Sequence, residues 1–407
     1  FSYDVPSTKE LVEYIQEYDK GIYRISNRNG GLGTANDVIN ARYYQNSIYS
    51  SLSNQNYQNF YYNLIGNDIL NRSKGQLSNP KNLLFNVYMG NKYMIGGGYQ
   101  ELGYKKVKNI DNNFLYKNDE VSPIGYSSSK IMSKEDFDKL EYPYNAEALL
   151  NYVIVDNEKT NIDYNTNIEE ISLNYNISSK RNIEISKEND YILITSDKNG
   201  SLTLDLEDKL SNKILFIKFE LLDSNPCSIG DNLISINNVI NKLTCKSWKY
   251  NNGNYSFEYT ISNKNINQLD IKFDKGSYKI KNIETYILDY DDFVTSYSDV
   301  EPFEIDVSKT KADVIEGNIN SSVDGYFNLS IPYDKGFSIY VDGEKIEYEK
   351  TDLAFIGFQM QKGNHHIKIV YTSPLLNVSK VISLVGITIF ISVLCIEQRK
   401  KCKTVSK

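Results

Sequence analysis

The stretch NIEISKENDYILITSDKNGSLTLDL, residues 182–206, shows most directly how this chain folds. Apolar Ile and Leu alternate with polar residues, which is the pattern of β-strands that bury one face. Three later runs repeat the pattern: KILFIKFELL (213–222), YSFEYTIS (255–262) and QLDIKFDKGSYKIKNIETYILDY (268–290). Strands of this length and spacing predict an antiparallel β-sandwich, jelly-roll-like, over residues 153–300.

The residues before this region have a mixed pattern. Apolar residues at helical spacing predict a helix over 6–21 and a second helix near 56–66. Alternating runs near 91–97 and 112–119 predict strands, and helices are expected at about 133–141 and 145–151. Residues 1–152 are therefore predicted to form a mixed α/β domain, so the fold class of the whole chain is α+β.

A second β segment is predicted over residues 301–373. It contains SIPYDKGFSIYVDGEKIEY, residues 330–348, which is typical of a tight hairpin over 337–348. A two-residue type I′ turn at Asp342 and Gly343 puts the apolar residues on one face. The expected pairs are Val341–Glu344, Ile339–Ile346 and Phe337–Tyr348.

An apolar stretch at 375–397 predicts one transmembrane helix, because about 20 residues span a bilayer. The basic residues that follow predict a cytoplasmic tail over 398–407, and hence a large domain outside the cytoplasm. The predicted anchor residues in contact with membrane lipid are Val381, Ile382, Leu384, Val385, Ile387, Ile389, Phe390, Ile391, Val393 and Leu394.

Charge and cysteines limit the function classes. The chain has 45 Lys and Arg against 52 Asp and Glu, a net charge of −7, which argues against a nucleic-acid partner. Cys395 lies in the apolar stretch and Cys402 in the tail, where a free thiol is expected. Cys227 and Cys245 remain, either as a disulfide or as two thiols.

Few residues suggest chemistry. Trp248 is either a platform for stacking a sugar ring or a core residue. Asp289, Asp291 and Asp292 are spaced to share a calcium ion, but the Gly and the distal Glu of a full calcium loop are missing, so an acidic turn is favoured and no metal is predicted. No catalytic residue can be assigned from the sequence.

Several motifs together resemble the YfhO-type bacterial membrane proteins. At the C-terminal end these are an S-I-P-Y strand (330–333), a V-D-G turn (341–343), an A-F-x-G turn (354–357) and a G-x-H strand (363–365), followed by the last membrane span. YRISNRNG (23–30), NVYMGNKYMIGG (86–97) and NNFLYKNDEVSPIGY (112–126) match the same order more loosely.

The resemblance implies a GT-C-like glycosyltransferase of the bacterial cell membrane. Such a protein moves a sugar from a polyprenyl-phosphate carrier to a cell-surface polysaccharide or teichoic acid, such as lipoteichoic acid. Its catalytic acidic residue is expected upstream of Phe1, so this chain is expected to hold no cofactor and to orient the acceptor. The alternative is a non-catalytic, membrane-tethered module that binds a glycan or a protein.

Overall fold

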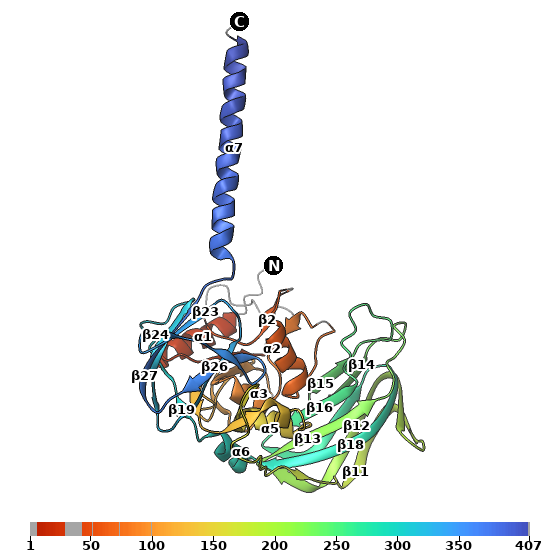
Figure 1. Ribbon diagram of the computed structural model, residues 1–407. Coiled ribbons are helices and arrows are strands. Elements are labelled where there is room, and N and C mark those ends of the chain that lie inside the picture. The colour runs from red at the N-terminus through yellow and green to blue at the C-terminus, as the bar shows by residue number, and fades with distance from the viewer. Residues whose placement is uncertain (1–5, 29–42, 51, 73, 99, 406–407) are drawn as a thin grey trace.

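The computed structural model describes residues 6–28, 43–50, 52–72, 74–98 and 100–405. Figure 1 shows a folded region of β-sheets and short helices, from which one long helix, α7 (Leu376–Val405), projects. The sheets are mostly antiparallel and the helices are few, as the predicted α+β class requires.

The N-terminal part is a small sheet covered by one helix. Helix α1 (Pro6–Tyr18) buries Leu11, Val12 and Ile15 against this sheet, so the predicted helix at 6–21 is confirmed over most of its length. The sheet has the order β1-β4-β6-β5, with β1 parallel to β4 and the other pairs antiparallel. Its strands are β1 (Ile25–Asn27), β4 (Tyr93–Gly96), β6 (Asn113–Lys117) and β5 (Lys105–Ile110).

The largest core lies between the short helices that follow. Aromatic rings fill much of it: Phe60 lies 5.1 Å from Tyr88 and 4.8 Å from Phe355, measured between ring centroids. The elements around this core are β2 (Ile48–Tyr49), α2 (Gln55–Asn59), the π-helix η2 (Phe60–Leu64), β3 (Gln76–Leu77), α3 (Leu83–Tyr88), β8 (Ile131–Ser133), α4 (Lys134–Phe137), α5 (Tyr144–Asn151), β9 (Val153–Val155) and α6 (Tyr290–Tyr297).

The predicted β-sandwich is a single nine-stranded antiparallel sheet that curls until it almost closes (Figure 1). We call residues 169–289 the β-module. Strand β12 is 20 residues long and pairs with β17 along one half and with β18 along the other. Two groups of strands therefore extend from β12, one through β17 and β14 to β15 and the other through β18 and β13 to β16. The last strands, β15 and β16, meet where the Asn241 side chain donates to the Glu258 carbonyl at 2.7 Å.

The strands of the β-module are β10 (Glu169–Glu170), β11 (Tyr175–Lys187), β12 (Ile192–Ser211), β13 (Lys213–Leu221), β14 (Asn232–Ile236), β15 (Val239–Leu243), β16 (Ser256–Ile261), β17 (Asn265–Phe273) and β18 (Gly276–Asp289).

Two five-stranded sheets form the last layer and share a core of Phe, Ile and Leu side chains. One has the order β19-β7-β22-β26-β25 and the other β20-β21-β27-β23-β24. Their strands are β7 (Gly125–Ser128), β19 (Glu301–Pro302), β20 (Glu304–Ile305), β21 (Val314–Ser321), β22 (Gly325–Pro332), β23 (Phe337–Val341), β24 (Glu344–Ile346), β25 (Glu349–Thr351), β26 (Phe355–Met360) and β27 (Gly363–Tyr371).

This layer joins a strand from the first 152 residues to strands from residues 301–373. β7, from residues 125–128, pairs with β22 through Tyr326–Ser128 and Asn328–Tyr126, among others. The segments 1–152 and 301–373, which the sequence treats as separate domains, therefore share a sheet.

The hairpin forms in the predicted register over its first pairs. Val341 pairs with Glu344 and Ile339 with Ile346. Asp342 and Gly343 have φ values of 52° and 88°, the left-handed backbone that a type I′ turn needs. The third expected pair is wrong because β24 ends at Ile346. On the opposite edge of β23, Phe337 pairs with Tyr371 of β27.

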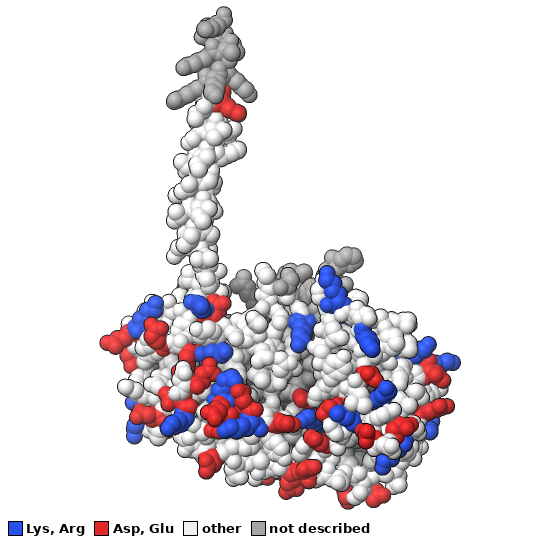
Figure 2. Space-filling view, turned by 45° about the vertical axis from the view of Figure 1, so that its right-hand side comes forward, with Lys and Arg blue, Asp and Glu red and all other residues white. Residues whose placement is uncertain are grey.

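Helix α7 contains a 23-residue stretch, Leu376–Gln398, that is long and apolar enough to cross a membrane. The predicted anchor side chains in it are exposed, as lipid contact requires. Figure 2 shows that most of the helix bears no charged side chain. The helix continues to Val405, so the backbone of the predicted tail is helical almost to its end.

Candidate functional site

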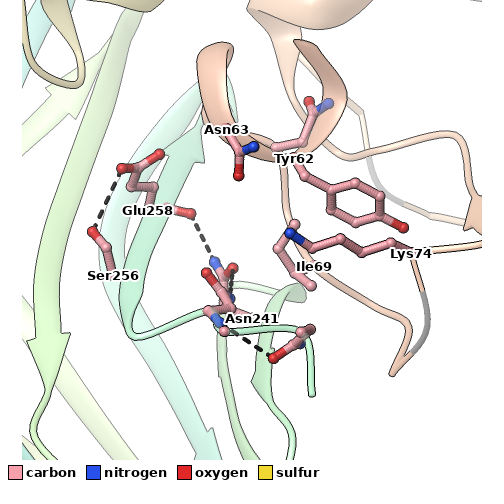
Figure 3. Close-up of a pocket in the computed structure, with 11 residues that line it drawn as sticks. Tyr62, Asn63, Ile69, Lys74, Asn241, Ser256 and Glu258 are labelled. Carbon is pink, nitrogen blue, oxygen red and sulfur yellow. Dashed lines mark hydrogen bonds between the residues drawn. The ribbon is translucent and has the colours of Figure 1, made fainter. Parts of the chain in front are cut away.

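A polar pocket of about 250 Å³ lies where the segment that follows helix α2 meets the β-module (Figure 3). One wall is formed by residues 62–69 and Lys74, which follow helix α2, and the other by residues 241–258, which belong to β15, β16 and the loop between them. Its lining consists mainly of amide, hydroxyl and charged side chains: Tyr62, Asn63, Asn67, Ile69, Lys74, Asn241, Asn252, Gly253, Asn254, Ser256 and Glu258.

The π-helix η2 positions the first wall. Asn54 caps α2 by accepting from the Tyr57 backbone N–H, and the helix then widens at Phe60–Leu64. The rings of Phe60 and Tyr61 are buried in the core. Tyr62 and Asn63, which follow them in η2, line the pocket.

Tyr62 and Lys74 lie together on this wall. The Tyr62 hydroxyl donates to the Gln76 carbonyl at 2.7 Å, which fixes the ring, and burial raises the pKa of this phenol. The Lys74 ammonium lies 5.6 Å from the centroid of the Tyr62 ring, and Figure 3 shows its side chain running beside that ring. The wall thus combines an aromatic surface with a positive charge.

Asparagines build the second wall. Asn252 donates to the Lys242 carbonyl at 2.8 Å and accepts from the Thr244 backbone N–H at 3.2 Å, which closes the loop on itself. Asn254 donates to the Asn241 side-chain oxygen at 3.3 Å. These bonds order the amides before any ligand arrives, so less entropy is lost when a ligand binds.

Glu258 supplies the carboxylate of the pocket. Burial raises the pKa of its side chain to about 7, although the positive charge of Lys218 acts in the opposite direction. Lys218 lies directly opposite Glu258 on β13 and forms an ion pair of 2.7 Å with Glu141. The charge of Glu258 therefore changes near neutral pH.

Arg72 holds the two walls together, and a disulfide within the β-module supports the second wall. The Arg72 guanidinium forms an ion pair with Asp231 at 2.8 Å and stacks over the Trp248 ring at 4.0 Å from its centroid. Cys227 and Cys245, for which the sequence left two states open, form a disulfide, and the Cys245 N–H donates to Asp231 at 3.1 Å.

Trp248 thus lies beside the pocket rather than in its lining. Its side chain is 40% exposed, so it is not a core residue, but Arg72 covers one face of the ring. A ligand could stack only on the other face.

The three aspartates belong to a helix terminus. Asp289 caps α6 and accepts from the backbone N–H of Asp291, while Asp291 and Asp292 occupy the first turn. Negative charge at this end of a helix is favourable without a metal. Within the described residues, no three His, Cys, Asp or Glu side chains are arranged to hold a metal ion.

Sequence analysis missed the pocket residues. The signal that could have drawn attention was the density of Asn in NNGN, residues 251–254, between two strands. Nothing in the sequence indicated that this loop faces residues 62–74, because the contact depends on how the β-module docks.

A family model described as "Bacterial membrane protein YfhO" matches residues 1–383. The chain belongs to the YfhO family. It is 24% identical over 386 residues to the uncharacterized protein YfhO of Bacillus subtilis (strain 168), an alignment that covers 93% of this chain and 44% of that protein. The chain thus spans less than half the length of this relative.

Solved structures with partial likeness to this YfhO-family chain include carbohydrate-binding modules. A family 29 module from Piromyces equi is 10% identical, with a TM-score of 0.19, over 30% of this chain and 91% of the module. A low-affinity xylan-binding module from Roseburia intestinalis is 8% identical, with a TM-score of 0.20, over 30% of this chain and 94% of the module. A likeness this limited assigns no ligand to the present chain.

Proposed function

We propose that the folded region binds a hydroxyl-rich polymer at the polar pocket and orients it as the acceptor for a membrane glycosyltransferase-like protein. The pocket carries the proposal. Its ordered amides provide both hydrogen-bond donors and acceptors, and Tyr62 and Ile69 add apolar surface. Sugar and polyol groups need this combination, because each hydroxyl both donates and accepts.

The acceptor in this proposal is a cell-surface polysaccharide or a teichoic acid, such as lipoteichoic acid. The sugar donor is a polyprenyl-phosphate carrier, and we place the catalytic residues in the part of the longer relative that this chain does not cover. We place the folded region outside the cytoplasm and the C-terminus inside, since RKKCK at 399–403 follows the apolar stretch.

One observation also supports a second function, a non-catalytic module that binds a glycan or protein. Glu258 is the one carboxylate among the pocket's lining residues. Sugar hydrolysis ordinarily uses two carboxylates, so the pocket by itself suits binding rather than hydrolysis.

The test is calorimetric titration of the 407-residue chain, reconstituted in nanodiscs, with a short glycerol-phosphate polymer and with neutral oligosaccharides. Combining Asn63→Ala with Lys74→Ala should weaken binding by about tenfold or more, equivalent to about 1.4 kcal/mol. The matched control combines Asn176→Ala with Lys187→Ala on β11, where both side chains are exposed. Absence of binding by the unmodified chain would overturn the proposal.

Sugar-transfer assays distinguish the two functions. A longer family member that includes the upstream part should transfer sugar to the polymer, and the pocket substitutions should raise its KM for acceptor more than they lower its kcat. Binding without transfer would leave the tethered module as the function.

A further inference from the structure

The folded region is joined to α7 by a very short connection. Only residues 372–375 separate the end of β27 from the start of α7, and four residues span at most about 14 Å. The Thr372 N–H also donates to the Gly336 carbonyl at 2.9 Å, which holds the connection against the β22–β23 loop. The surface around this loop must therefore lie close to the bilayer that α7 enters.

Aromatic side chains surround this connection. Tyr371 lies 4.8 Å from Phe337, and Tyr333 lies 5.5 Å from Tyr348, both measured between ring centroids. All four side chains are half-buried. Tyr rings are enriched at the boundary between headgroups and hydrocarbon, because one end of the ring is apolar and the other can form hydrogen bonds.

Leu52 belongs to the same surface. It is 92% exposed, the highest value among the large apolar side chains in the described chain. Two residues later, Asn54 donates to the Tyr333 carbonyl at 2.8 Å, so the loop that carries Leu52 is tied to the β22–β23 loop beside α7. Figure 1 shows β2 and β23 on the side of the folded region from which α7 leaves.

We infer that this surface is a membrane-contact surface, formed by Leu52 and the four aromatic residues, and that Leu52 inserts into the headgroup layer of the bilayer. The length of α7 fits this position. Its 23-residue apolar stretch is about 35 Å long, slightly more than the hydrocarbon thickness of about 30 Å, so Leu376 lies at the hydrocarbon boundary. The connection then runs within the headgroup layer.

Charge distribution agrees with this orientation. On the face that Figure 2 shows, the described side chains on the upper edge to the right of α7 are uncharged or basic, while acidic and basic side chains lie together at the foot of α7 and over the lower half. Bacterial anionic lipids would repel an acidic edge, whereas they tolerate or attract a basic one.

The experiment places an environment-sensitive fluorophore at position 52 in the 407-residue chain. Leu52→Cys is made in a Cys395→Ser, Cys402→Ser background and labelled with NBD, and the chain is reconstituted in nanodiscs of phosphatidylglycerol and phosphatidylethanolamine. Lipids with a spin label near the headgroup then quench any fluorophore in that layer.

Two controls set the scale. Leu375→Cys, in the connection itself and 75% exposed, is the positive control. Val323→Cys is the negative control: its side chain is 47% exposed, but it precedes β22, whose eight residues place it about 26 Å from the Tyr333 end.

Quenching at position 52 that approaches the value at 375 and exceeds the value at 323 at least twofold supports the inference. Quenching at 52 equal to that at 323, with strong quenching at 375, overturns it, because the Leu52 loop would then face water or protein. Circular dichroism melting of each labelled chain, compared with the unlabelled background, shows that the labelled proteins are folded.

Discussion

Arg24 and Ser330 are 306 residues apart in the sequence, yet the buried Arg24 guanidinium donates to the Ser330 carbonyl at 2.6 Å and to its hydroxyl at 2.7 Å. The same guanidinium donates to the Met89 carbonyl at 2.6 Å. Three of the motifs that carry the family resemblance, around residues 24, 89 and 330, therefore meet at one side chain.

Replacing Arg24 should strongly destabilise the fold. Arg24→Ala leaves two buried carbonyls and a hydroxyl without their donor, and we expect the free energy of unfolding to fall by about 3–5 kcal/mol. Denaturant melts followed by circular dichroism give this value. Arg181→Ala, at an exposed position on β11, is the matched control and should change it by less than about 0.5 kcal/mol. Similar losses for both variants would contradict the role of the network.

Asp352 should make stability depend on pH. Its carboxylate accepts from the Tyr88 hydroxyl, the Asn328 amide and the Ile154 N–H, but burial raises its pKa to about 7. Between about pH 4 and 7 the unfolded chain releases this proton while the folded chain keeps it, so this group lowers the free energy of unfolding as pH rises.

The measurement is the melting temperature across that pH range. Asp352→Asn should flatten the decline relative to the unmodified chain, whatever its effect at a single pH, because the titrating group is gone. The exposed Asp190→Asn should leave the slope unchanged. An identical slope in the Asp352→Asn variant would show that another group causes the pH dependence.

Ligand binding should also depend on pH through Glu258, because burial raises the pKa of its carboxyl group to about 7. Above that pH the pocket gains a negative charge, so a polyanionic ligand should bind several-fold more weakly at pH 8 than at pH 6. Glu258→Gln should remove this difference in a calorimetric titration. Persistence of the full difference in the variant would place the titrating group elsewhere.

The single tryptophan reports on the contact between the two walls. Trp248 is the only Trp of the chain, and Arg72 covers one face of its ring. Arg72→Ala should expose the ring and move the fluorescence emission to longer wavelength. Arg181→Ala should leave the emission unchanged, and an unchanged spectrum in both would show that the stacking is absent in solution.

Local pattern predicted much of this fold, and long-range docking accounts for what it missed. Alternation located most of the β-module strands, although not β14 and β15, and the Asp342-Gly343 turn predicted the hairpin register as far as Ile339–Ile346. The Phe337–Tyr348 pair failed because β24 ends at Ile346, and the chain then enters β25 at Glu349, which belongs to the other five-stranded sheet. The pocket could not be predicted at all, since its two walls come from residues about 180 positions apart, such as Asn63 and Asn241.

The position of β7 has a consequence for how the chain is made. Both neighbours of β7 in its sheet, β19 and β22, are synthesised more than 170 residues later, at residues 301–302 and 325–332. During biosynthesis the edges of β7 remain unpaired until these strands emerge, and an unpaired edge can associate with other chains. The N-terminal third therefore completes its folding only when the ribosome has nearly reached α7.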